Sequence, residues 1–268
     1  MTMDSNIPFF KFSATGNDFI LIDNRENILA GDETDFFRTI CQRRTAVGAD
    51  GVLLIENEAQ HDFRMRYFNA DGTETACGNG ARSSAYFAFH QGFAERRMSF
   101  VSDDEVYEAE VDCNSVKLRM PQPQDVRETV GIVDEDVLQE AGFVHIGVPH
   151  FVLLGTEIGK LNVDELGRKY RKHARFHPQG TNVNFVKVVS PHQVKLRTFE
   201  RGVEQETLSC GTGCVASAYL LNLKNQARFP IEVLTQGGEL RVYSDDERGE
   251  LFLEGEVKLV FEGKLILE

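Results

Sequence analysis

The sequence has no apolar run that approaches the roughly 20 residues a transmembrane helix needs, so it does not predict a membrane-spanning protein. Its first residues also lack the basic and apolar regions of a secretory signal peptide. Positive charge is in short supply, because 29 Lys and Arg residues face 42 Asp and Glu residues and the formal net charge is −13. Nucleic acids and anionic membrane surfaces would be repelled by such a chain. We therefore expect a soluble enzyme that binds neither nucleic acid nor membrane.

Cysteine is scarce as well, with five residues in a chain of 268. An odd number in a chain of this length is not typical of a disulfide framework, and free thiols indicate the reducing cytoplasm. The chain lacks the Cys-x-x-Cys pairs of zinc sites, and it has no phosphate-binding loop of the Gly-x-x-x-x-Gly-Lys type. The Gly-x-Gly that starts at Gly78 lacks the rest of a dinucleotide-binding fingerprint. We therefore expect no metal and no nucleotide cofactor.

One stretch of the sequence occurs twice. Residues 77–86 read Cys-Gly-Asn-Gly-Ala-Arg-Ser-Ser-Ala-Tyr, and residues 210–219 read Cys-Gly-Thr-Gly-Cys-Val-Ala-Ser-Ala-Tyr. An alternating strand pattern and a short acidic turn precede each copy. A buried structural cysteine would explain a single copy, but the matched context of the two copies favours a shared chemical role. Each half of the chain is predicted to present one thiol at the start of a helix.

A cysteine at a helix start has distinctive chemistry. The first N–H groups of a helix have no partner within it, and the helix dipole adds partial positive charge there. Glycines let the backbone approach an anion closely. A thiolate in this position is stabilised, so that the thiol pKa falls below the usual value of about 8.5. Two such starts facing each other would place a thiol on either side of a carbon that carries a carboxylate, as proton removal and return across a stereocentre requires.

Hydrophobic periodicity predicts strands and helices in a similar order in both halves. The helices after the two cysteines, at 78–90 and 211–222, are apolar on nearly every side, which predicts that they are buried. The other predictions that matter below are helices at 34–44 and 163–172, and strands at 143–154, 257–261 and 264–267.

The fold class that follows is α+β, with two pseudo-symmetric lobes. Each lobe is expected to wrap a mostly antiparallel sheet around its apolar central helix, with the active site in the cleft between the lobes. Prolines just after residue 120 mark the best domain boundary. Residues 1–120, completed by the C-terminal strand 257–268, would form the N-terminal lobe with the first cysteine unit. Residues 121–256 would form the C-terminal lobe with the second.

Amide and charged side chains gather near both cysteine units in the sequence. Asn69 precedes the first unit, and Glu200 and Arg201 precede the second. Asn17 and Asn182 occupy matched turns. These groups suit an amino acid, whose ammonium group binds carboxylates or carbonyls and whose carboxylate binds arginine or N–H groups. For any single asparagine, holding its own turn is the simpler interpretation.

Four motifs together identify a family. They are Ala-Thr-Gly-Asn-Asp-Phe at 14–19, Phe-Asn-Ala-Asp-Gly-Thr at 68–73, Ala-Cys-Gly-Asn-Gly-Ala-Arg at 76–82, and Glu-Arg-Gly at 200–202 followed by Ser-Cys-Gly-Thr-Gly at 209–213. In this order they resemble the motif set of the diaminopimelate epimerases, and the resemblance runs essentially from end to end. It implies a two-lobed isomerase without a cofactor that interconverts LL- and meso-diaminopimelate, a step towards lysine and peptidoglycan precursors.

The resemblance also implies roles for individual residues. Cys77 and Cys210 would be the two acid–base groups. One, as thiolate, removes the α-proton, and the other, as thiol, returns a proton to the opposite face. The sequence does not say which cysteine is the thiolate at rest. The other matching positions are, for substrate binding, Asn17, Asn69, Gly78, Asn79, Asn182, Glu200, Arg201, Gly211 and Thr212, and, for tuning the thiols, His150 and Glu200.

Three places depart from the commonest pattern of that family, and one of them is the stretch from Arg201 to Cys210, which is one residue longer than in several members. Many members have Asn where Val148 stands and Gln where Gly51 stands, and the differences concern recognition of the distal centre of the substrate. An epimerase or racemase of the same fold that acts on another amino acid is therefore an alternative. A thiol–disulfide switch and a ligand-binding module without activity are others. The expected partner is a small molecule, diaminopimelate, and the sequence leaves a homodimer open.

Overall fold

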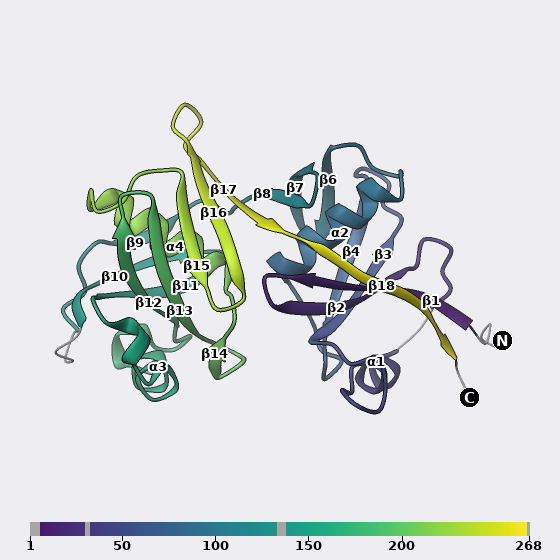
Figure 1. The fold of residues 1–268 in the computed structure, drawn as a ribbon, viewed down its shortest axis with the longest axis horizontal. Coiled ribbons are helices and arrows are strands. Elements are labelled where there is room, and N and C mark those ends of the chain that lie inside the picture. Colours follow the sequence, from purple (N-terminus) through teal and green to yellow (C-terminus); the bar gives the residue numbers. More distant parts are fainter. Residues whose placement is uncertain (1–5, 30–32, 133–137, 267–268) are drawn as a thin grey trace. The chain divides into compact units, whose positions relative to one another are not determined.

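The fold is mixed α+β and dominated by strands, as the sequence predicted (Figure 1). The chain divides into two compact units. Unit 1 comprises Met1–Leu118 and Gly255–Glu268, and unit 2 comprises Arg119–Glu254. The computed structural model describes residues 6–29, 33–132 and 138–266.

The described part of unit 1 consists of short apolar strands linked by tight turns, with two α-helices among them. Its elements are β1 (Asn6–Ala14), β2 (Asn17–Asp23), α1 (Thr34–Ile40), β3 (Gly51–Glu56), β4 (Phe63–Asn69), β5 (Glu74–Thr75), α2 (Gly78–His90), β6 (Arg97–Ser102), β7 (Glu105–Asp112), β8 (Ser115–Arg119) and β18 (Lys258–Ile266). The strands pair in the order β18, β1, β2, β3, β4, β6, β7, β8, and β5 also pairs with β4. The β2–β3 and β4–β6 pairs are parallel, and the other pairs are antiparallel.

Unit 2 follows the same plan. Its elements are β9 (Gln124–Arg127), β10 (Leu138–Ile146), β11 (Val148–Gly155), α3 (Val163–Arg171), β12 (Asn182–Ser190), β13 (Gln193–Glu200), β14 (Gln205–Thr207), α4 (Gly211–Leu223), β15 (Ile231–Thr235), β16 (Gly238–Asp245) and β17 (Glu250–Glu256). The strands pair in the order β9, β10, β11, β12, β13, β15, β16, and β14 also pairs with β13. Again two pairs are parallel, β11–β12 and β13–β15.

The strand registers define equivalent positions in the two units. In each unit a parallel pair is followed by an antiparallel pair, so one residue from each of three strands lies on a common line across the sheet. On one such line the residues are Phe19, Gly51 and Asn69 in unit 1, and His150 and Asn182 in unit 2, where the β12–β13 register continued by one residue adds Glu200. Asn182 therefore corresponds to Gly51, so the expectation that Asn17 and Asn182 occupy matched turns is wrong. Two residues further along the strands, on the same face of each sheet, the pairing partners are Leu53 and Tyr67 in unit 1, and Asn184 and Thr198 in unit 2.

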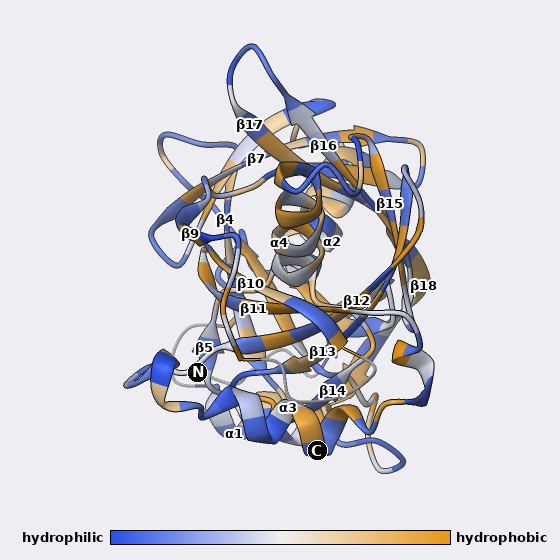
Figure 2. Cartoon of the chain, turned by 90° about the vertical axis from the view of Figure 1, so that its left-hand side faces the viewer, coloured by the Kyte–Doolittle hydropathy of each residue, from blue (hydrophilic) through white to orange (hydrophobic). Residues whose placement is uncertain are grey.

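The helices that follow the cysteines are buried by the strands of their own units. Helix α2 contacts β1, β2, β3, β4 and β7, and α4 contacts β10, β11, β12, β13, β15 and β16. Figure 2 shows α4 in the middle, with β10, β11, β12, β15 and β16 around it. Small residues dominate both helices, which lets the strands approach closely, and most side chains in each helix are buried. The predicted burial of both helices is confirmed.

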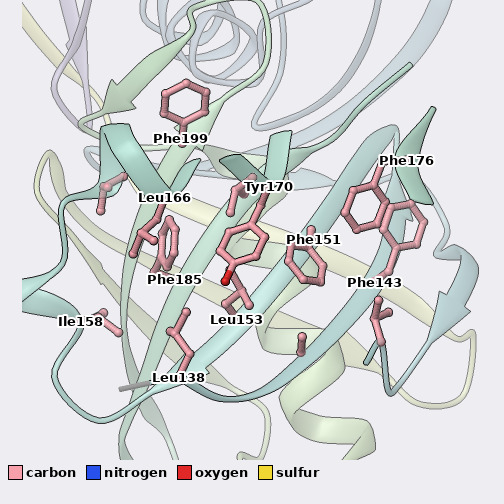
Figure 3. Packing of buried hydrophobic residues seen from close by; sticks show 14 residues of the cluster. Leu138, Phe143, Phe151, Leu153, Ile158, Leu166, Tyr170, Phe176, Phe185 and Phe199 are labelled. Carbon is pink, nitrogen blue, oxygen red and sulfur yellow. The ribbon is translucent and has the colours of Figure 1, made fainter. Parts of the chain in front are cut away.

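The opposite faces of the sheets carry the short helices α1 and α3. Side chains alternate between the two faces of a strand, so Phe151 and Phe199 point to α3 while their neighbours face α4. In unit 2 these aromatic residues pack with Leu166 and Tyr170 of α3 (Figure 3). The contact is close, because a Cβ built on Gly167 would lie 2.3 Å from the Phe199 Cβ.

Three predicted elements differ from the observed ones. The predicted strand at 143–154 is a hairpin of β10 and β11, because Gly147 has a φ of +66° and turns the chain. The strands predicted at 257–261 and 264–267 are one strand, β18, in which Gly263 lies opposite Phe9 of β1. The helix predicted at 34–44 ends earlier, since α1 stops at Ile40.

Candidate active site

The first cysteine unit begins α2. Cys77 is the N-cap residue, with extended backbone angles (φ −149°, ψ 111°). Its carbonyl accepts the first helical hydrogen bond from Ala81 N at 2.8 Å, and its sulfur accepts one from Gly80 N at 3.3 Å. A Cβ built on Gly78 would meet no heavy atom within 4 Å. There is therefore open space beside the backbone at this helix start.

The side-chain amide of Asn17 faces the Cys77 thiol. Its Nδ2 donates to Asp50 Oδ2 at 2.7 Å. Its Oδ1 accepts from the Cys77 thiol at 3.8 Å and from Asn79 Nδ2 at 3.3 Å. A carboxylate can only accept hydrogen bonds, so Asp50 fixes which way the Asn17 amide points. Three predicted site residues, Asn17, Cys77 and Asn79, thus lie together.

A cluster of charges supports this arrangement from behind. Asp18 is paired with Lys11 at 2.6 Å and with Arg43 at 2.5 Å, and Arg43 also contacts Asp50 at 2.8 Å. Burial alone would raise the pKa of Asp18, but the hydrogen bonds and charges of Arg43 and Lys11 lower it to about 2. Asp18 is therefore ionised at any pH at which the chain works, and the loop around Asp50 is held by charge.

The neighbouring Tyr67 leaves room only for glycine at position 51. A Cβ built on it would lie 2.3 Å from the Phe68 carbonyl oxygen and 2.5 Å from Cε2 of the Tyr67 ring. No side chain fits there without displacing Tyr67 or the backbone of β4. The departure from glutamine at this position is therefore explained by the aromatic residue that covers it.

The second cysteine unit begins α4 in the same way. Cys210 is the N-cap residue (φ −122°, ψ 109°), and its carbonyl accepts from Cys214 N at 3.0 Å. Burial raises the pKa of the Cys210 thiol well above its usual range, and the nearby Glu200 carboxylate raises it further. The Gly213 N–H and the Thr212 hydroxyl, which lies 3.7 Å from the sulfur, lower the pKa by less. Cys210 is therefore a thiol at neutral pH.

Glu200 and Cys210 influence each other. Burial raises the pKa of Glu200, whereas the Thr207 hydroxyl and the Cys210 thiol lower it. An ionised Glu200 thus opposes ionisation of Cys210, and the Cys210 thiol favours the ionised form of Glu200.

His150 lies on β11 in a buried polar cluster. Its side chain is fully buried, and its Nδ1 is 3.1 Å from Asn184 Nδ2. Burial, with smaller contributions from the charges of His145 and Arg201, lowers the pKa of His150 to about 3. Thr198, on β13, donates its hydroxyl hydrogen to Asn184 Oδ1 at 3.0 Å. The imidazole is therefore neutral at physiological pH.

The remaining predicted residues have identifiable surroundings. Asn182 is buried, and its Oδ1 accepts a hydrogen bond from the backbone N–H of Arg201 at 2.7 Å. Asn69 Nδ2 donates to Thr73 Oγ1 at 3.0 Å, within its own turn. A Cβ built on Gly211 would lie 2.9 Å from Leu253 Cδ2, so this helix start is more crowded than that of α2.

Sequence reasoning missed Asp50, Asn184 and Thr198. Asn184 carried a readable signal, since a polar residue in the interior of an otherwise apolar strand is rarely buried without a purpose. Asp50 and Thr198 carried none, because both residue types are common where they stand. Among the described residues, no three His, Cys, Asp or Glu side chains gather as a metal site would require. In the same part of the chain, no helix is both long and apolar enough to span a membrane.

Solved structures with the same fold define the class of protein. A phenazine biosynthesis protein of the PhzF family from Bacillus anthracis superposes with a TM-score of 0.75, at 16% identity, and the match covers 98% of this chain and 99% of that one. A hydroxyproline epimerase from Agrobacterium vitis superposes with a TM-score of 0.67, at 15% identity, over 100% and 94% of the two chains. At these identities the likeness shows the fold alone, that of the PhzF and proline racemase-like proteins.

Sequence comparison is more specific. The profile of the family described as diaminopimelate epimerase matches residues 9–124 and 142–260. The diaminopimelate epimerase of Aquifex aeolicus is 42% identical over 272 residues, which cover 96% of this chain and 97% of that protein. The diaminopimelate epimerase of a Hydrogenobaculum species is 39% identical over 96% and 98% of the two chains. The chain belongs to the diaminopimelate epimerase family, and it is an isomerase.

Proposed function

We propose that Cys77 and Cys210 act as the two bases of a diaminopimelate epimerase. As a member of the family, the chain interconverts LL- and meso-diaminopimelate. The proposal adds that one cysteine removes the α-proton while the other delivers a proton to the opposite face. The single observation that carries it is the duplicated helix start, in which each unit presents one cysteine as the N-cap of a buried helix.

The chemistry demands more than two thiols. An α-proton is far less acidic than a thiol, so the carbanion must be stabilised as it forms. Backbone N–H groups at a helix start supply fixed partial positive charge for this purpose. In the proposal, the N–H groups at Gly78 and Asn79, and at Gly211 and Thr212, hold the reacting carboxylate from two sides.

The two cysteines also need different protonation states. Cys210 is a thiol at neutral pH, because burial and Glu200 raise its pKa. We therefore assign Cys210 as the proton donor and Cys77 as the base, which becomes a thiolate by losing the hydrogen that it donates to Asn17 Oδ1. This form runs the reaction in one direction and leaves the roles exchanged. The exchanged form then runs the reverse reaction or is reset by proton exchange with solvent.

The substrate's other groups would be held by the side chains around the helix starts. The Oδ1 of Asn17 lies beside Cys77, and Asn182 is tied to the backbone of Arg201. Asn69, Glu200 and the Arg201 guanidinium supply hydrogen-bonding and charged groups suited to ammonium and carboxylate ends.

Replacing each cysteine tests the assignment. Cys77→Ser and Cys210→Ser should each slow the epimerisation of LL-diaminopimelate by several orders of magnitude. The rate is measured as the appearance of meso-diaminopimelate. Cys113→Ser is the matched control, because Cys113 is an exposed free thiol, and it should retain wild-type activity. Undiminished turnover in either active-site variant would refute the two-base assignment. Turnover of proline or glutamate but not diaminopimelate would favour a racemase of the same fold.

The cellular compartment follows from the chemistry. All five cysteines are free in the structure, and a reaction that cycles a thiol and a thiolate fails if the two oxidise. We propose that the enzyme works in the reducing cytoplasm.

Strand β18 exposes apolar side chains that a second copy of the chain would cover. Its outer residues Leu259, Val260 and Phe261 are 40%, 48% and 47% exposed, and Ile266 is 77% exposed. An apolar strand surface of this kind is typical of protein interfaces. We propose that it forms a homodimer interface.

Sedimentation equilibrium tests the dimer. Phe261→Asp should convert a dimer to a monomer, whereas Val189→Asp, at a position 45% exposed in unit 2, should leave the dimer intact. A wild-type chain that stays monomeric at high micromolar concentration would refute the proposal.

A further inference from the structure

The two units place different chemistry behind their cysteine-capped helices. At three equivalent positions, unit 2 has a polar cluster and unit 1 has hydrophobic rings and a leucine. The pairs are Phe19 and His150, Leu53 and Asn184, and Tyr67 and Thr198.

The glycines of the two helices corroborate this equivalence. A Cβ built on Gly80 of α2 would lie 2.8 Å from Leu53 Cδ2, and a Cβ built on Gly213 of α4 would lie 2.4 Å from Asn184 Oδ1. Each helix therefore rests its third residue on the same strand position. Unit 1 shows that the fold closes well with an apolar residue there, since Leu53 is fully buried.

Burying polar side chains costs free energy unless every polar atom is hydrogen-bonded, so three of them in place of apolar residues indicate a role other than folding. His150, Asn184 and Thr198 are 0%, 0% and 2% exposed. Their equivalents in unit 1 include Phe19, which packs edge to face on Tyr67 with ring centres 5.7 Å apart. Unit 1 folds with apolar side chains at these positions, so folding alone does not require the polar cluster of unit 2.

The hydrogen bonds of Asn184 determine which nitrogen of His150 carries the proton. Asn184 Nδ2 lies 3.3 Å from the Phe151 carbonyl oxygen, which can only accept. The amide nitrogen must therefore point to that carbonyl, and Oδ1 must accept from the Thr198 hydroxyl. The same Nδ2 meets His150 Nδ1 at 3.1 Å, so Nδ1 is an acceptor. The neutral ring then carries its proton on Nε2.

That Nε2–H is an oriented donor without an acceptor in the described part of the chain. It is buried, and it has no hydrogen-bond partner among those residues. Asn184 also packs against the start of α4. A Cβ built on Gly213 would lie 2.4 Å from Asn184 Oδ1 and 3.3 Å from Cys210 Sγ. The Asn184 side chain thus orients the His150 ring and contacts the start of α4.

We propose that Asn184 is a positioning residue of the second cysteine site. It fixes His150 as the neutral Nε2–H tautomer, which offers this hydrogen to the reacting groups, and it seats Gly213 at the start of α4. It thereby makes the Cys210 side of the reaction chemically different from the Cys77 side. The role of His150 toward the reacting groups rests on the function proposed above, whereas the tautomer is independent of that function.

Nitrogen NMR of the histidine rings in the full chain tests the tautomer directly. In the wild type, the His150 ring should stay neutral with its proton on Nε2 from pH 5 to pH 8. In Asn184→Asp the carboxylate should draw the proton to Nδ1, and the ring should become protonated at a higher pH. A wild-type ring with its proton on Nδ1, or an unchanged ring in Asn184→Asp, would overturn the proposal.

Kinetics test the consequence for the reaction. Asn184→Asp should lower kcat for epimerisation at least 10-fold with a smaller change in KM, and it should shift the pH profile of kcat. Asn24→Asp is the matched control, because Asn24 is a 2% exposed asparagine of unit 1 whose Nδ2 donates to two acceptors, Leu29 O and Glu56 Oε1. This control should leave the His150 ring signals and the shape of the pH profile unchanged.

A variant that copies the apolar plan of unit 1 separates folding from function. His150→Phe, Asn184→Leu and Thr198→Val together should fold with wild-type circular dichroism but lose activity at least 100-fold. Wild-type kcat in this triple variant, or in Asn184→Asp despite a changed tautomer, would overturn the positioning role. A wild-type chain that does not turn over diaminopimelate would instead refute the proposed function and leave the NMR result to decide the tautomer.

Discussion

At the scale of single residues, the two cysteine sites differ in charge and polarity. The position beside Cys210 that is occupied by Glu200 corresponds to Asn69 in unit 1, and the position of His150 corresponds to Phe19. A carboxylate therefore acts on the Cys210 thiol, whereas the equivalent residue of unit 1 is a neutral amide. In the proposed two-base mechanism, identical bases would have equal affinity for the proton, and these two differences would make the affinities unequal.

Glu200→Gln should make Cys210 easier to ionise. The carboxylate raises the pKa of the Cys210 thiol, so its removal should lower the pH at which the thiolate forms. Alkylation of Cys210 followed by mass spectrometry across pH 7 to pH 10 measures this midpoint. The midpoint should move down in Glu200→Gln and stay put in Glu239→Gln, an exposed carboxylate of the same unit. An upward shift would contradict the assignment of Glu200.

His150 should make the chain sensitive to acid. Its folded pKa of about 3 lies below the ordinary 6.5, so the unfolded chain binds the extra proton first. The stability due to neutral His150 is therefore complete above pH 6.5 and is lost as the pH falls towards 3, by on the order of a few kcal/mol. Urea unfolding at pH 7 and pH 4.5 should show a smaller pH-dependent loss in His150→Phe than in the wild type. An equal loss in both would contradict the burial argument.

At the scale of elements, the two cysteine-capped helices differ in what packs on their first turns. Gly80 and Gly213 press on strand residues behind them, whereas Gly78 faces open space. The same glycine-rich motif thus contains residues required for packing and residues that leave room for a ligand.

Substitution by alanine should separate these two kinds of glycine. Gly213→Ala should destabilise the chain by about 1–3 kcal/mol, because the new Cβ would overlap Asn184 Oδ1 and overpacking is costly. Gly78→Ala, placed in open space at the first residue of α2, should leave stability unchanged or raise it by up to about 1 kcal/mol. Chemical denaturation of both variants decides the matter, and a stable Gly213→Ala would show that the Asn184 contact is loose.

Sequence patterns predicted these elements unevenly. The helices at 78–90 and 211–222 were predictable because small and apolar residues follow a cysteine–glycine start. The hairpin of β10 and β11 was not, because a turn made by Gly147 alone leaves the apolar pattern on both sides unbroken. Residues such as Asn184 were missed for a related reason, since their partners lie on other strands and only the register brings them together.

At the scale of the whole molecule, one strand plan is used twice with different side chains. Local patterns revealed the repeat of the cysteine units, and the registers extend it to most strands. The family and the reaction were predictable from motifs in both halves, whereas the asymmetry between the halves appeared only when equivalent positions could be aligned through the sheets. We infer that the duplication supplies the two bases and that its divergence assigns them their protonation states.

Epimerisation in deuterium oxide tests the two-base account most directly. With separate donor and acceptor thiols, early in the reaction the newly formed meso-diaminopimelate should carry deuterium at the inverted carbon while the remaining LL-diaminopimelate keeps its hydrogen, as read by mass spectrometry below 5% conversion. Product that retains the original hydrogen, or substrate that exchanges as fast as product forms, would mean that a single base serves both faces and would contradict the account.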